Sequence, residues 1–132
     1  MLIRVAVENN IEGRSMASAL DLPGCFAYGS EETEALIRIP QAVVAFKTWL
    51  DGCTTDSWLK NLTDFDIRLV ETFTAYKVND AFQPDEHGEL EINAWFHDDW
   101  RPLTELEITR RLQVAAWARS EEHTSELQSR QV

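Results

Sequence analysis

Apolar and polar positions along the first 75 residues follow two different periods. Residues 2–8 alternate strictly, with Ile3, Val5 and Val7 on one face, which predicts a half-buried strand. Similar short stretches and the turn residues between them indicate further strands. The predicted strands span residues 2–8, 14–20, 25–28 and 65–70, with a hairpin loop at 9–13 and a turn at 21–24.

A helix is predicted between the third and fourth strands. Ser30 is a favourable N-cap, and the glutamates that follow it suit the positive end of a helix dipole. Gly52 is expected to end the helix, while Pro40 predicts a kink or break near Ile39. Apolar residues spaced three or four apart form one stripe that should pack on the sheet: Leu36, Ile39, Val43, Phe46 and Leu50.

The pattern weakens after Phe73. Residues 76–103 read as a linker with one further strand over residues 89–96. Thr104 and Glu107 form a capping box that opens a second helix over residues 104–118. Its apolar positions are Leu106, Ile108, Leu112, Ala115 and Ala116. The expected fold class is therefore α+β, a βββαβ domain over residues 1–75 followed by a linker and a truncated C-terminal helix.

Residues 119–129 differ from the rest of the chain. They read RSEEHTSELQS, which has no apolar stripe and resembles the in-frame translation of a widely used short-read sequencing adapter. We therefore interpret residues 119–132 as an adapter-derived artefact, expect them to be disordered, and leave them out of the fold prediction.

Net charge narrows the classes of partner. The chain carries 12 Lys and Arg against 23 Asp and Glu, a net charge of −11, and this surface would repel a phosphate backbone and attract a basic protein. No apolar run approaches the length of a membrane span, and the N-terminus has no signal-peptide pattern. The expectation is a cytoplasmic protein with no nucleic acid and no membrane among its direct partners.

A compact motif lies at the end of the second predicted strand. It reads Leu20-Asp21-Leu22-Pro23-Gly24-Cys25, followed by Gly29, then by Glu32 and Ala35-Leu36 in the first turns of the helix. Together with the βββαβ order, this segment resembles the HicB-like antitoxin family. The resemblance implies a reduced ribonuclease H-like sheet with one helix packed across it, without the catalytic acids.

The same resemblance implies a function. In a type II toxin-antitoxin system such a domain is not an enzyme, and it covers the active site of a small basic RNA-cleaving toxin. The acidic composition of this chain fits that partner. A further, purely structural reading is an orphan dimerisation domain, with a homodimer as its assembly; the sequence leaves open whether a sheet edge would form the contact. Residues 89–118 lack the basic DNA-binding helices that family members commonly carry, which places operator binding in doubt.

A second resemblance concerns residues 82–118. Phe82-Gln83-Pro84-Asp85, Pro102-Leu103-Thr104 and Arg111-Leu112 with Ala115-Ala116-Trp117-Ala118 resemble the linker and first helix of longer proteins in which a HicB-like domain precedes a DinB-like bundle. The alternative function is thus the N-terminal accessory domain of a metal-dependent DinB-like transferase. The metal-binding histidines of that family are not present here.

Few residues suggest chemistry of their own. Cys25, Cys53, His87 and His97 show no metal-ligand spacing, and Glu31, Glu32 and Glu34 are explained by the helix dipole, so no catalytic, metal or cofactor site is expected. Turn chemistry explains Pro23 and Gly24. Asp98 and Trp100 are candidate partner contacts, because Trp is enriched at the centres of protein interfaces.

Overall fold

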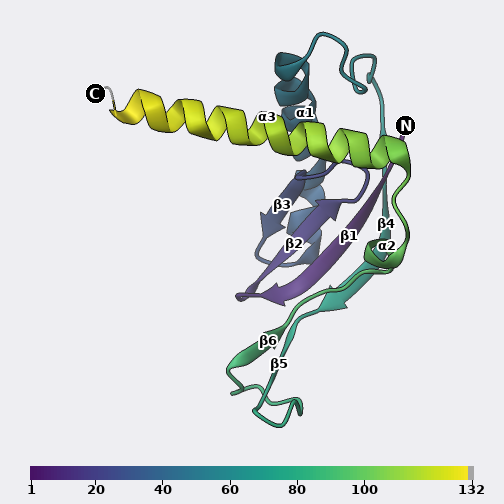
Figure 1. Cartoon of the computed structure of the whole chain (residues 1–132). Coiled ribbons are helices and arrows are strands. Elements are labelled where there is room, and N and C mark those ends of the chain that lie inside the picture. The colour runs from purple at the N-terminus through teal and green to yellow at the C-terminus, as the bar shows by residue number, and fades with distance from the viewer. Residues whose placement is uncertain (131–132) are drawn as a thin grey trace.

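The computed structural model has an α+β fold built on a mixed four-stranded sheet (Figure 1). It describes the backbone of residues 1–130 and the side chains of residues 1–121. Strand order is β3-β2-β1-β4, in which β1 pairs antiparallel with β2 and parallel with β4. The elements are β1 (Leu2–Ile11), β2 (Arg14–Ala19), β3 (Phe26–Gly29), α1 (Glu32–Cys53), β4 (Asp66–Thr74), β5 (Tyr76–Val78), β6 (Leu90–Ile92), α2 (His97–Trp100) and α3 (Glu105–Arg130). The predicted βββαβ order is confirmed.

Two tight turns set the register of the first three strands. The first is shorter than the predicted loop, because β1 reaches Ile11 and only Glu12 and Gly13 separate it from β2. Both have positive φ, the combination that a two-residue type I′ hairpin turn requires. The second turn spans residues 22–25, with Pro23 followed by Gly24 at φ +87°, as a type II turn requires.

Helix α1 covers one face of the sheet and differs from its prediction in three details. Its N-cap is Glu31, whose carboxylate accepts the Glu34 N–H at 2.8 Å, while Ser30 instead donates its hydroxyl to the Glu34 side chain. The first buried position is Ala35 in place of Leu36, which is only partly buried. The expected break at Pro40 is wrong. Pro40 lies on the exposed side of an unbroken helix. Buried residues of α1 before and after Pro40 pack on the sheet, and this packing keeps the helix continuous.

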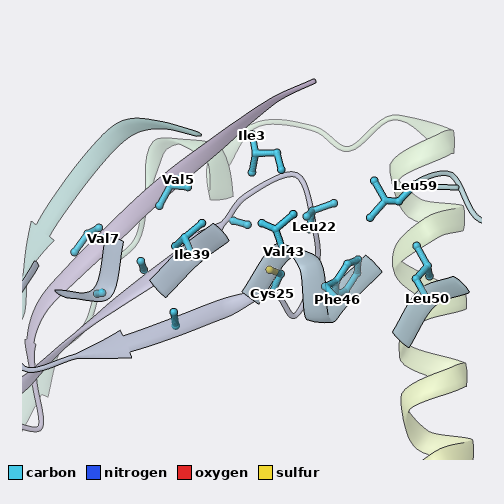
Figure 2. Packing of buried hydrophobic residues seen from close by; sticks show 14 of the residues in the cluster. Ile3, Val5, Val7, Leu22, Cys25, Ile39, Val43, Phe46, Leu50 and Leu59 are labelled. Atoms are coloured by element: carbon cyan, nitrogen blue, oxygen red, sulfur yellow. The ribbon is translucent and has the colours of Figure 1, made fainter. Parts of the chain in front are cut away.

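The hydrophobic core lies between α1 and the sheet (Figure 2). Ile3, Val5 and Val7 are fully buried, which confirms the inward face predicted for the first strand. They meet the buried stripe of α1, formed by Ala35, Ile39, Val43, Phe46 and Leu50. Burial of this many aliphatic side chains, each worth about 1.5–3 kcal/mol, is the main force that closes this layer.

Beyond β4 the segment predicted as a linker with one further strand contains two short strands. Strand β4 extends to Thr74, and β5 pairs with β6 in a separate two-stranded sheet that projects beyond one end of the main sheet (Figure 1). The strand expected over residues 89–96 is limited to the three residues of β6. Residues 93–101 then return along the main sheet, as described below. Strand β4 is an edge of the sheet.

Helix α3 begins with the predicted capping box. The Thr104 hydroxyl accepts the Glu107 N–H at 3.2 Å, and the Glu107 carboxylate accepts the Thr104 N–H at 3.1 Å. The predicted apolar stripe does not pack inward, because Leu106, Ile108 and Leu112 are exposed. The residues that face the domain are Glu107, Arg110, Arg111, Val114 and Trp117.

The backbone is helical as far as Arg130, where the sequence led us to expect a disordered segment from residue 119. This stretch contains good helix formers such as Glu, Leu and Gln, and it has no Pro or Gly to stop a helix. The side chains of residues 122–130 and the whole of residues 131–132 lie outside the described part of the chain.

Candidate functional site

Residues 93–101, which we call the return segment, lie against β1 and β4 on the face of the sheet opposite α1. Polar contacts attach it to the sheet at three points, two of which use main-chain N–H groups of the segment. The buried carboxylate of Glu8 accepts the Ala94 N–H at 2.8 Å. The Glu71 side chain accepts the His97 N–H at 2.9 Å. This segment therefore combines directional hydrogen bonds with the buried ring of Phe96, whereas the α1 layer is held by apolar packing.

An ion-pair network fixes the end of the return segment. Asp98 Oδ1 accepts Arg4 Nη1 at 3.0 Å and Arg101 Nε at 2.8 Å. Arg101 also binds Glu107 at the start of α3, at 2.9 Å through Nη1 and 2.5 Å through Nη2. The network thus joins the sheet, the return segment and α3 in one chain of charge-assisted hydrogen bonds.

The pKa values of the two carboxylates reflect this network. Burial acts to raise the pKa of Asp98, but hydrogen bonds from Arg101 and Arg4 outweigh it and hold that pKa below its ordinary value. Hydrogen bonding to Arg101, with help from the Thr104 N–H, lowers the pKa of Glu107 to about 2. Both groups are therefore ionised at neutral pH.

Two indole rings stand on this scaffold. Trp95 and Trp100 lie edge to face, with ring centroids 5.6 Å apart, and 63% and 73% of their respective surfaces are exposed. We call them the indole pair. Trp100 is the exposed aromatic that the sequence singled out, whereas Trp95 gave no signal because its neighbours show no period that predicts its exposure.

Asp98, the other candidate contact, has a different place from the one we expected. Its side chain is only 10% exposed and is held by two arginines, so Asp98 positions the indole pair and is not a free surface group. The correction has a simple cause. Arg4 and Asp98 are 94 residues apart in the sequence, so no local pattern could show that their side chains meet.

The residues of the turn motif contact the ion-pair network of Asp98 and the hydrophobic core. Asp21 binds both the main-chain N–H of Arg4, at 2.9 Å, and its guanidinium, at 2.7 Å, so that Arg4 links the motif to Asp98. Leu22 is fully buried beneath the turn made by Pro23 and Gly24.

Cys25 and Gly29, the two remaining motif residues, have structural roles. Cys25 is 5% exposed, and burial raises the pKa of its thiol to about 11, so the reactive thiolate is scarce at neutral pH. A Cβ at Gly29 would lie 2.4 Å from the Ala35 nitrogen, so only glycine allows α1 to approach β3 this closely.

Within the described residues, no group of three or more His, Cys, Asp and Glu side chains gathers in a way that could hold a metal ion. Glu31, Glu32 and Glu34 lie in the first turn of α1, where Glu31 and Glu34 bind backbone N–H groups. None of the helices described is long and apolar enough to cross a bilayer. Comparisons with protein families, with curated proteins and with solved structures give no match to this chain.

Proposed function

We propose that the chain is a non-enzymatic protein-binding module of the HicB-like, antitoxin type. The observation that carries the proposal is the indole pair, two largely exposed Trp rings fixed on an ion-paired segment. The βββαβ order and the type II turn at residues 22–25 support the HicB-like assignment.

The indole pair has the properties of an interface anchor. Indoles bury a large apolar area with few rotatable bonds, and residues held in place before binding lose little entropy when a partner docks. Here the hydrogen bonds of Asp98 restrain the backbone between the two rings. A mobile pair of Trp residues would pay more entropy for the same contact.

The charge of the chain indicates the kind of partner. A net charge of −11 accelerates encounter with a basic protein and disfavours acidic ones. We therefore propose a small basic RNA-cleaving toxin as the occupant of the indole-pair surface.

Co-expression tests this function. The chain is produced with each small basic protein that sequencing finds encoded beside its gene, and cell growth and co-purification are measured; absence of any such gene contradicts the proposal. We expect the wild-type chain to restore growth and the W95A/W100A double variant to fail. Phe82→Ala is the matched control, because Phe82 is also 73% exposed but lies in the β5–β6 loop.

Two further outcomes would contradict the proposal. One is a wild-type chain that neither binds nor neutralises the neighbouring protein. The other is a W95A/W100A variant that remains folded and protects cells as well as the Phe82→Ala control does.

One observation favours the second candidate, an accessory domain of a DinB-like transferase. The outward face of α3 carries Ile108 and Leu112, 44% and 66% exposed, together with exposed Ala115 and Ala116. Further helices of a bundle would cover such a stripe. Sequencing the source gene across the codon for Arg119 distinguishes the candidates. Continuation into amphipathic helices with spaced histidines supports this one, and an immediate stop codon contradicts it.

A further inference from the structure

A concave region lies where the start of β1, the turn motif and the first turns of α3 meet. Its volume is about 440 Å³. It is lined by Met1, Leu2, Arg4, Leu20, Asp21, Pro23, Trp58, Arg101, Glu107, Arg110 and Arg111. We call it the arginine pocket, because four of the nine arginines of an acidic chain line it.

The four guanidinium groups fall into two pairs. Arg4 pairs with Asp21, and Arg101 pairs with Glu107. Asp21 and Glu107 are the two carboxylates that line the pocket. Arg110 and Arg111 have no carboxylate partner among the described residues, although both are half-buried. Two adjacent cations taken partly out of water without a counter-charge are costly, and an anion between them would remove that cost.

Trp58 adds an aromatic wall to the pocket. The Arg110 guanidinium carbon lies 5.1 Å from the centroid of the Trp58 ring, within the range of a cation–π contact. Leu20 and Pro23 supply apolar surface nearby. The pocket therefore combines cationic hydrogen-bond donors with a flat apolar wall, which is the usual composition of a small-molecule site.

We propose that the arginine pocket binds a small anion that carries an aromatic ring. The phosphate or carboxylate group would accept hydrogen bonds from Arg110 and Arg111, and the ring would lie against Trp58 and Leu20. Arginine forks match both kinds of anion in a bidentate arrangement. This ligand would also hold α3 to the sheet domain, because its two walls come from these two parts of the chain.

The test is a titration of the full chain followed by ¹H–¹⁵N NMR. The probes are phenyl phosphate, benzoate and benzyl alcohol, which share a ring and differ in charge. The Trp58→Phe variant assigns the Trp58 indole signal among the five Trp signals. We expect one or both anions to shift the Trp58 signal in a saturable way, and we expect the alcohol not to shift it. The anion that binds more tightly identifies the preferred head group.

Substitution then locates the binding groups. We expect the R110A/R111A variant to bind at least tenfold more weakly, while Val114 and Trp117 keep α3 packed on the core. Arg38→Ala, on α1 and outside the pocket, is the matched control and should bind as the wild type does. Added salt should weaken binding of the anions.

The proposal is overturned by any of three results. They are no saturable shift of the Trp58 signal with either anion, equal binding of benzyl alcohol, or an R110A/R111A variant that is folded by circular dichroism and binds as tightly as Arg38→Ala. None of these results depends on the indole pair, so the pocket and the proposed toxin contact are tested separately.

Discussion

The layers that pack on the two faces of the main sheet are held by different physical means. On one face, a single 22-residue helix packs five buried side chains against β1, β2 and β3. On the other, the return segment buries one ring, Phe96, and is held by the carboxylates of Glu8 and Glu71 and by the ion pairs of Asp98. Apolar packing gives the first face most of the stability of the fold, and directional polar contacts give the second face a defined shape with its Trp rings exposed.

This difference explains why the candidate site lies where it does. The residues that close the α1 face are packed in the core and are not available to a partner. A face closed by a short segment with polar anchors can leave Trp95 and Trp100 exposed without losing its conformation. Four predictions test the comparison, from the largest expected effect to the smallest.

Replacement of a core residue should have the largest effect. We expect Ile39→Ala to lower the free energy of unfolding by about 2–5 kcal/mol, because it leaves a cavity in the fully buried α1 layer. Ile37→Ala, two positions away on the same helix but 70% exposed, should change it by less than about 0.5 kcal/mol. Urea unfolding measures both, and equal losses would contradict the assignment of the core to this face.

Removal of the central carboxylate of the return segment should cost less. We expect Asp98→Ala to lower the free energy of unfolding by about 2 kcal/mol, because two guanidinium groups lose a partner. Asp64→Ala, in the exposed loop before β4, serves as the control. A loss at Asp98 as large as that at Ile39 would mean that both faces contribute equally to stability.

The same network predicts a dependence on pH. The pKa of Glu107 is lowered to about 2 in the folded chain, against an ordinary value of 4.5, so its stabilisation is complete above pH 4.5 and is lost as the pH falls toward 2. The wild type should therefore be more stable than Glu107→Gln at pH 6, with a difference that shrinks at pH 3. Urea unfolding at the two pH values checks this, and a difference that grows in acid would contradict it.

Thiol reactivity tests how tightly the core between α1 and the sheet is packed, and it has the smallest expected effect. The pKa of Cys25 is raised to about 11 by burial, whereas Cys53 is only partly buried at the end of α1. We expect a thiol reagent at pH 8 to modify Cys53 first and Cys25 only after unfolding. The Cys53→Ser variant should lack the fast phase, and a fast phase that persists in it would show that the turn motif opens readily.

Local sequence signals predicted the α1 face well. The alternation of Ile3, Val5 and Val7 and the stripe that ends at Leu50 each carry a clear period, and the Thr104–Glu107 capping box is a short-range motif. Pro40 misled because sequence alone does not tell whether tertiary contacts hold a helix together across a proline.

The opposite face could not be predicted in the same way. The contacts of Arg4 with Asp98 and of Glu8 with Ala94 join residues 94 and 86 positions apart, and no local pattern encodes such pairs. The inward side of α3 was missed for a related reason. Its apolar stripe suggested packing, yet Arg110 and Arg111 face the domain and Leu112 faces outward.

Amide hydrogen exchange of the chain, alone and with the basic partner identified by co-expression bound, tests the central claim most directly. Without the partner, amides of β1 and α1 should exchange only through global unfolding, and those of residues 94–101 should exchange faster through local opening. With the partner, we expect new protection at residues 94–101 and none on the exposed side of α1. New protection confined to α1, with residues 94–101 unchanged, would contradict the account.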